Sequence, residues 1–159
     1  MTIDEIKLLV TKSVKKLRDE NPHLFVVDIN ERSIMHKFAE ILQKIIGDRW
    51  DVDCEYNRNG HDAKYLDLSV DHIRSDDLTS CTVYPDIIIH KRDTSNNLLV
   101  IELKKSTNKQ PRSKDYRKLS AYRSQLGYEY AVFIQFEMSS DRTLDLIQYN
   151  EEWAKNCDA

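Results

Sequence analysis

Two short segments carry charged side chains beside strongly apolar runs. Pro85 and Asp86 precede the apolar run 87–89, and residues 102–104 (Glu-Leu-Lys) follow the apolar run 98–101. Carboxylates and an ammonium group at the edges of buried strands are costly unless they are paired or used in chemistry. Because carboxylate oxygens suit Mg²⁺ or Mn²⁺ better than zinc, the residue types predict a divalent metal site. Such a site would activate water for attack on a phosphodiester.

Strand geometry predicts which of these side chains lie together. Side chains alternate between the two faces of a strand, so Glu102 and Lys104 are expected to share one face. Leu98 and Val100 are expected behind them on the same face. The opposite face is expected to carry Leu99, Ile101 and Leu103.

The polar segment 93–97 is expected to be the turn of a hairpin that joins the two apolar runs. A hairpin that folds near its second and third residues places Asp86 opposite Glu102 or Leu103. Directly opposed residues have Cβ atoms about 4.5–5.5 Å apart, and two carboxylates that close repel unless a cation lies between them. The alternative is an edge aspartate and a surface Glu-Lys pair on an ordinary hairpin.

Pro85 and Asp86, followed by Glu-Leu-Lys at 102–104, resemble the motif of the PD-(D/E)XK nuclease superfamily, which has the restriction-endonuclease-like fold. The resemblance covers roughly residues 30–137. It implies an α/β fold, an α/β/α sandwich with a central mixed β-sheet, and this architecture also fits the expected order of helices and strands.

The resemblance also implies a role for each motif residue. Asp86 and Glu102 would bind Mg²⁺ (or Mn²⁺), together with the backbone carbonyl of Leu103. Lys104 would orient the attacking water, lower its pKa, or steady charge on the scissile phosphate. No covalent enzyme intermediate is expected, because no serine or cysteine lies in an activated setting.

A third carboxylate lies at the start of a predicted helix over residues 31–46. Asn30 is the expected N-cap and Gly47 the expected C-terminal stop. Glu31 lies in the middle of the apolar stripe of this helix, so its carboxylate points toward the core. It either complements the helix dipole or, by the resemblance, joins the metal site through water or at a second ion. The expected stripe consists of Ile34, Phe38, Ile41, Leu42 and Ile45.

A further helix is expected after the Glu-Leu-Lys segment, with Ser113 as its cap and Gly127 as its end. One branch of the superfamily carries Gln-x-x-x-Tyr on this helix. Here Lys118 stands in the glutamine position and Tyr122 in the tyrosine position. We interpret Tyr122 as part of the core and Lys118 as a phosphate contact or a solvated charge. The expected buried seam contains Leu119, Tyr122 and Leu126.

Basic residues are concentrated in the segment 104–123, where eight lysines and arginines are opposed only by Asp115. The segment therefore carries +7 in a chain whose net charge is −3. Such a strip is suited to a nucleic-acid backbone, and the alternative is a solvated loop and helix face. The candidate nucleic-acid contacts are Lys105, Lys109, Arg112, Lys114 and Lys118.

The remaining elements are expected from apolar periodicity and capping residues. A helix over residues 3–19 begins with a possible capping box of Thr2 and Glu5. Residues 57–60 are expected to form a turn, and residues 61–80 a loop or a short helix beside the site. Strands are expected over 50–56 and 128–136, a strand or helix over 144–147, and a short helix over 151–156.

Length and composition indicate a single nuclease-like domain over residues 1–159, with a C-terminal extension over 138–159. The apolar fraction of 40% and the charged fraction of 32% are typical of a soluble globular protein. No apolar run approaches the roughly 20 residues of a membrane span, and the start of the chain has no signal-peptide pattern. The three scattered cysteines are expected to be reduced thiols, so a cytoplasmic location is expected.

These observations favour a metal-dependent nuclease acting on nucleic acid, with DNA expected before RNA. The alternative is a non-catalytic or partner-dependent nucleic-acid-binding module with a nuclease-like fold. A homodimer is one expected assembly, because cutting two strands often uses two sites, and a larger nuclease assembly is another. Sequence specificity and the choice between endonuclease and exonuclease stay open, since no readout element is recognisable.

Overall fold

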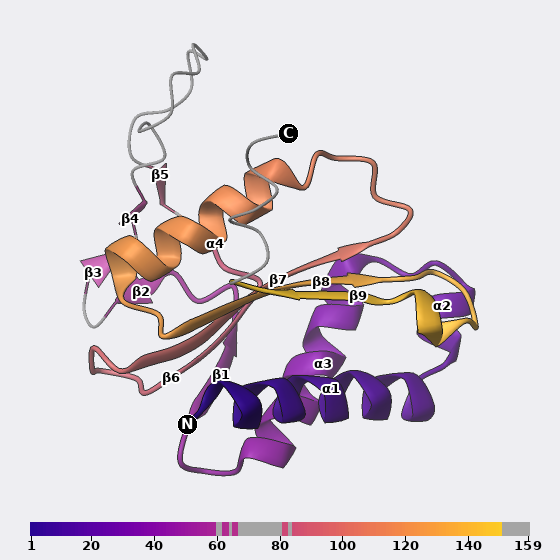
Figure 1. Cartoon of the computed structure of the whole chain (residues 1–159), viewed down its shortest axis with the longest axis horizontal. Helices are drawn as coiled ribbons and strands as arrows, with labels where there is room; N and C mark the ends of the chain where they lie inside the picture. Colours follow the sequence, from indigo (N-terminus) through magenta and orange to yellow (C-terminus); the bar gives the residue numbers. More distant parts are fainter. Residues whose placement is uncertain (60–61, 64, 67–80, 83, 151–159) are drawn as a thin grey trace.

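A mixed β-sheet forms the centre of the computed structural model, which describes residues 1–59, 62–63, 65–66, 81–82 and 84–150 (Figure 1). The β7 and β8 strands of this sheet run parallel, and the other neighbouring strands run antiparallel. In spatial order the strands are β1 (Asp51–Cys54), β6 (Ile87–His90), β7 (Asn97–Lys105), β8 (Tyr130–Phe136) and β9 (Leu146–Tyr149).

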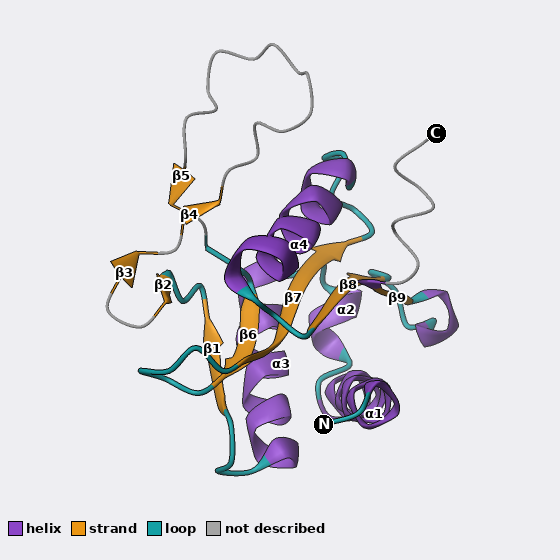
Figure 2. Cartoon of the chain, turned by 60° about the vertical axis from the view of Figure 1, so that its left-hand side comes forward, coloured by secondary structure: helices purple, strands orange, loops and turns teal. Residues whose placement is uncertain are grey.

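Helices cover both faces of this sheet (Figures 1 and 2). The larger apolar core lies under α1 (Ile3–Glu20), α2 (His23–Val26) and α3 (Glu31–Ile46). The smaller core lies on the opposite face, under α4 (Ser113–Leu126). The predicted mixed α/β arrangement is therefore confirmed, while the restriction-endonuclease-like core stays a prediction. No helix in the described ranges is long and apolar enough to cross a membrane.

Several helix ends lie where their capping residues predict. Thr2 and Glu5 form a reciprocal capping box at the start of α1. Asn30 caps α3 through a hydrogen bond that its side chain accepts from Ser33 N. Gly127 ends α4 in the left-handed conformation, with φ of 68°, which glycine adopts without a steric penalty.

The predicted cap of α4 is wrong by one residue. Ser113 is the first residue of the helix, and the N-cap position is Arg112, whose side chain makes no capping hydrogen bond. The backbone of Arg112 is already helical, with φ of −69° and ψ of −19°. Ser113 therefore lies inside the first turn, where its hydroxyl is not placed to cap.

A register shift in the hairpin corrects the predicted faces of β7. Ile89 pairs with Leu99, whereas the next residue, His90, pairs with Asn97, so Leu98 is an extra residue on β7. Leu98 packs in the larger core together with Leu99, and not behind Glu102 as the alternation predicts. Beyond the irregularity the alternation holds, because Val100 packs in the smaller core on the α4 side.

Other predicted elements hold in part. Ile45, expected in the apolar stripe of α3, is 39% exposed because the helix ends one residue later, while Met35 and Ala39 are buried instead. The connection after β8 contains a 3₁₀ turn at Arg142–Leu144 and leads into β9, so the C-terminal extension supplies the last strand of the sheet.

Three of the short strands lie in the region predicted as turn and loop, and β5 lies directly after it. Two antiparallel pairs join β2 (Arg58–Asn59) to β3 (Asp62–Ala63) and β4 (Tyr65–Leu66) to β5 (Cys81–Thr82). The turn expected over 57–60 is therefore partly strand. Most of residues 61–80 and the helix expected over 151–156 lie outside the described residues.

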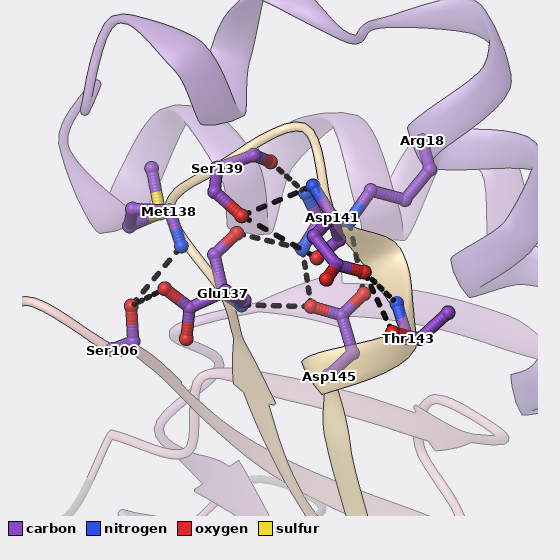
Figure 3. Close-up of polar contacts among 8 residues, drawn as sticks. All are labelled: Arg18, Ser106, Glu137, Met138, Ser139, Asp141, Thr143 and Asp145. Carbon is purple, nitrogen blue, oxygen red and sulfur yellow. Dashed lines mark hydrogen bonds and ion pairs between the residues drawn. The ribbon is translucent and has the colours of Figure 1, made fainter.

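A buried ion pair fastens α1 to the connection between β8 and β9 (Figure 3). The side chain of Arg18 is 4% exposed and pairs with the buried Asp145. Its guanidinium also donates to the carbonyls of Glu137 at 2.7 Å and Ser139 at 2.9 Å. Ser106, the residue after β7, joins the same connection by donating to Glu137 Oε1 at 3.0 Å. This network therefore fixes the end of β7, where the candidate site residues lie.

Removing the Arg18 side chain should be strongly destabilising. In Arg18→Ala, Asp145 would keep a buried charge without its partner, and losses of this kind are about 3–5 kcal/mol. The free energy of unfolding measured in urea is the test. Lys15→Ala is the matched control, because it breaks the ion pair of Lys15 with Asp19 on the exposed side of the same helix, where we expect a loss of about 0.5 kcal/mol or less. Equal losses in the two variants would contradict a structural role for the buried pair.

Candidate active site

Pairing of β6 with β7 brings Asp86 to Glu102. Ile87 pairs with Ile101 in the antiparallel ladder. Asp86 precedes this pair and Glu102 follows it, so the two residues lie opposite each other across the hairpin. The backbone N–H of Leu103 donates to Asp86 Oδ2 at 2.8 Å. This register agrees with the position that the hairpin spacing predicts for Asp86.

The carboxylate of Glu102 is buried and only partly satisfied. The residue is 3% exposed, and its Oε2 accepts a hydrogen bond from Lys118 Nζ at 2.8 Å. Its buried Oε1 and the hydroxyl of Tyr122 both lack a hydrogen bond of regular geometry, although these two side chains interact. Burial, reinforced by the charge of Asp86, raises the pKa of Glu102 to about 8. The neighbouring positive charge therefore does not fully compensate the burial of this carboxylate.

The negative charge of Asp86 is likewise not fully compensated by its neighbours. Burial raises its pKa to about 6, although the hydrogen bond from Leu103 and the charge of Lys118 act in the opposite direction. The carboxylates of Glu31 and Asp115 also raise the pKa of Asp86. Glu31 and Asp115 are thus close enough to oppose the ionisation of Asp86.

Helix α4 supplies a partner to each charged residue of the Glu-Leu-Lys segment. Lys104 is buried and forms an ion pair with Asp115. Glu102 pairs with Lys118, which lies three residues further along the same helix. Of the two sequence interpretations of Lys118, the solvated charge is wrong, because the side chain is paired with Glu102, and the phosphate contact stays a prediction. The Lys118 side chain is 28% exposed and lies inside the charged cluster.

Asp115 is a site residue that the sequence interpretation did not assign. The signal for it was present, because it is the single acidic residue in the basic segment 104–123. Tyr122 is buried in the core beneath α4, as predicted. Burial and the nearby charges of Glu102 and Asp86 raise the pKa of its hydroxyl above the ordinary value.

Glu31 reaches the same end of β7 from the first turn of α3. Its Oε1 accepts hydrogen bonds from the backbone N–H of Lys105 at 3.2 Å and from Asn108 Nδ2 at 2.7 Å. Asp28, just before α3, pairs with Lys105 Nζ at 2.8 Å. Glu31 therefore does more than complement the helix dipole, since it fastens the chain that follows Lys104.

The basic strip divides into engaged and exposed members. Lys105 and Lys118 are held by Asp28 and Glu102 respectively. Three further candidate contacts are exposed, along the connection from β7 and the start of α4. These three are Lys109, Arg112 and Lys114.

A second charged cluster lies at the opposite end of β6. Asp53 Oδ2 lies 2.8 Å from Nε2 of the buried His90 and accepts from Arg92 Nε at 2.9 Å. Although burial opposes it, hydrogen bonds from His90 and Arg92 hold the pKa of Asp53 well below its ordinary value. Both carboxylate oxygens of Asp53 are engaged, so this cluster is best explained as a structural clasp between β1 and the β6 hairpin.

The candidate site provides oxygen donors in an environment short of positive charge. Asp86 and the buried Oε1 of Glu102 match the donor chemistry of Mg²⁺ or Mn²⁺. Within the described ranges, however, no three or more histidine, cysteine or acidic side chains are grouped so that they could hold a metal ion. Completing a coordination sphere would therefore require backbone carbonyls, water or substrate oxygens in addition to these side chains.

Comparisons of the chain with protein-family models, with curated proteins and with solved structures find no match. A functional proposal therefore rests on the residues of this chain and on their geometry.

Proposed function

We propose that the protein is a divalent-metal-dependent nuclease of restriction-endonuclease-like fold that hydrolyses phosphodiester bonds, with DNA as the expected substrate. The observation that carries the proposal is the opposed pair Asp86 and Glu102. Both have raised pKa values, one buried oxygen of the pair lacks a hydrogen bond of regular geometry, and Lys104 follows two residues later on the same strand. Two opposed, under-neutralised carboxylates, of which Glu102 is buried and Asp86 partly buried, are costly to the fold, and a bound cation would offset that cost.

Each residue of the site has a task in this proposal. Asp86 and Glu102 would hold Mg²⁺ or Mn²⁺ together with the carbonyl of Leu103. The bound ion would supply Lewis acidity and lower the pKa of water. Lys104, held in place by Asp115, would place a positive charge next to the scissile phosphate and stabilise charge that develops there. Glu31 would keep the end of β7 in position through Lys105 and Asn108.

The direct test is cleavage of labelled substrates by the purified protein with Mg²⁺, with Mn²⁺ and with chelator. Single-stranded, duplex, supercoiled and branched DNA and RNA should be compared. Metal-dependent cutting would support the proposal, and the preferred substrate would identify the class of nucleic acid. Absence of cutting on every substrate, in either metal, would contradict a nuclease that acts alone.

The exposed basic residues after β7 are expected to contact the phosphate backbone. Replacing Lys109, Arg112 and Lys114 together by alanine should weaken DNA binding and make it less sensitive to salt. Each lost contact with duplex DNA lowers the slope of log K against log salt by about 0.9, so three contacts predict a change of about 2.7. Fluorescence anisotropy at several salt concentrations measures this slope.

The matched control for that experiment removes the same charge elsewhere. Lys12, Lys15 and Lys16 are exposed residues of α1, which packs on the opposite face of the sheet from α4. Their triple alanine variant should bind DNA with the slope of the wild type, apart from a small general effect of net charge. Equal slopes in the two triple variants would place the nucleic-acid contacts elsewhere.

A non-catalytic or partner-dependent nucleic-acid-binding module is the second candidate. The observation in its favour is that Lys104 and Lys118 are both engaged by protein carboxylates, so neither ammonium is directed at a substrate in this arrangement. Such a module would bind nucleic acid through the exposed basic residues without cutting it. Salt-dependent binding together with absence of cleavage would favour this candidate.

A further inference from the structure

The charged residues of β7 and α4 form two ion pairs, and each element supplies one carboxylate and one ammonium group. On the strand, Glu102 and Lys104 point toward the helix, and on the helix Asp115 and Lys118 point toward the strand. Glu102 pairs with Lys118, and Lys104 pairs with Asp115. The two pairs differ in exposure: the Lys104 side chain is buried, whereas Lys118 keeps 28% of its side chain exposed. Of the two ammonium groups, that of Lys118 is therefore the more accessible to water.

The ammonium group of Lys118 lies where the fields of several carboxylates converge. Its Nζ donates to Glu102 Oε2 at 2.8 Å, and the pairing of β6 with β7 places Asp86 opposite Glu102. A protein side chain thus provides positive charge at the point where the proposed function requires a metal.

The charge of Lys118 compensates the carboxylates only in part. When all four carboxylates Glu31, Asp86, Glu102 and Asp115 are ionised, they are opposed by the two ammonium groups Lys104 and Lys118, which leaves two negative charges in the cluster. Lys118 contacts only Oε2 of Glu102, while the buried Oε1 makes no hydrogen bond of regular geometry. A single ammonium group cannot serve both oxygens of Glu102 and the opposed Asp86, whereas the two carboxylates would together hold a doubly charged ion.

We propose that Lys118 is a displaceable counter-cation of the site: it holds Glu102 in the metal-free protein and releases this carboxylate when a divalent metal binds. The inference rests on the proposed function, since it concerns the regulation of the same site. Release is feasible because the lysine stem is long and the ammonium group has a path to solvent. The freed ammonium group would then be available to a phosphate oxygen of the substrate.

The first test is the affinity for Mn²⁺, measured by calorimetry on the metal-free protein. In Lys118→Met the stem keeps its approximate length and loses its charge, so Mn²⁺ no longer competes with an internal cation. We expect binding about tenfold tighter than in the wild type, or more. Lys118→Arg keeps the charge and should bind within a fewfold of the wild type. Unchanged or weaker binding by Lys118→Met would overturn the inference.

The second test uses wild-type protein and needs no variant to fold. Acylation of individual lysines by an N-hydroxysuccinimide ester is followed by peptide mass spectrometry, with and without Mn²⁺ at constant pH. Release from Glu102 should raise the labelling rate of Lys118 severalfold, while the rate at the buried Lys104 changes little. A rate at Lys118 that stays the same or falls when Mn²⁺ is bound would overturn the inference.

The outcomes separate this inference from the proposed function. If the wild type binds Mn²⁺ and cuts DNA but Lys118→Met binds no tighter, the inference fails and the function stands. If Lys118→Met binds Mn²⁺ more tightly and neither protein cuts any substrate, the inference stands and the function fails. If neither protein binds Mn²⁺, both are overturned.

Discussion

Replacing Glu102 by glutamine is expected to abolish metal-dependent cleavage while the protein stays folded. The change keeps the shape of the side chain and removes the charge that the proposed metal requires. Metal assistance contributes several kcal/mol to transition-state stabilisation, so the cleavage rate should fall by about 10³-fold or more. Single-turnover cleavage of the preferred substrate measures this loss. Asp86→Asn should behave in the same way.

The fold of the Glu102→Gln variant provides the accompanying control. Because burial raises the pKa of Glu102 to about 8, its ionised form is a cost to the metal-free fold, and glutamine removes that cost. We therefore expect no loss of unfolding free energy in chelator at pH 9. Glu20→Gln, at an exposed residue of α1, controls for the loss of one carboxylate. Cleavage at the wild-type rate by Glu102→Gln would remove Glu102 from the catalytic site.

The stability of the metal-free protein is expected to fall as the pH rises from 5 to 8. In the folded protein the pKa of Glu102 is about 8, against 4.5 ordinarily, and that of Asp86 is about 6, against 3.8. Between these values the folded state binds more protons than the unfolded chain, so raising the pH favours unfolding. These two groups stabilise the fold at low pH, and this contribution is lost as the pH rises through their pKa values in the folded protein. The expected loss is on the order of 5 kcal/mol.

Divalent metal should reverse this trend. Metal binding requires deprotonated carboxylates, so Mg²⁺ should stabilise the protein more at pH 8 than at pH 5. Urea unfolding at four pH values, in chelator and in Mg²⁺, measures both effects. In Glu102→Gln the fall of stability above pH 6 should largely disappear in chelator. A wild-type stability that rises from pH 5 to 8 without metal would contradict an under-neutralised pair of Asp86 and Glu102.

The parts of the fold that short-range rules control could be predicted from the sequence. Thr2 and Asn30 start helices, and Gly127 ends one, because each acts on backbone groups within three or four residues of itself. The opposition of Asp86 to Glu102 also followed, since a short polar turn and the alternation of side chains limit the hairpin to a few registers. The candidate carboxylate pair was therefore visible in the sequence.

Long-range packing decided how that pair is neutralised. Lys118 and Asp115 meet Glu102 and Lys104 only because α4 crosses β7 with one particular rotation about its axis. Spacing predicted that Leu119 and Tyr122 face the core, but it did not specify how α4 lies across β7 and which charged side chains therefore meet.

The residues whose positions were not predicted also depend on long-range packing. The extra residue Leu98 moved to the larger core because β7 matches β6 through an irregular pairing, and alternation alone cannot predict where such an irregularity falls. Arg18 and Asp145 are 127 positions apart. In the sequence each has the features of an ordinary surface charge, and only the folded sheet brings the two side chains together. The sequence by itself determined the charged motif, its hairpin and the helix ends, because these depend on neighbours along the chain. Only the tertiary structure decided which ammonium group holds which carboxylate, because that choice depends on how distant elements pack.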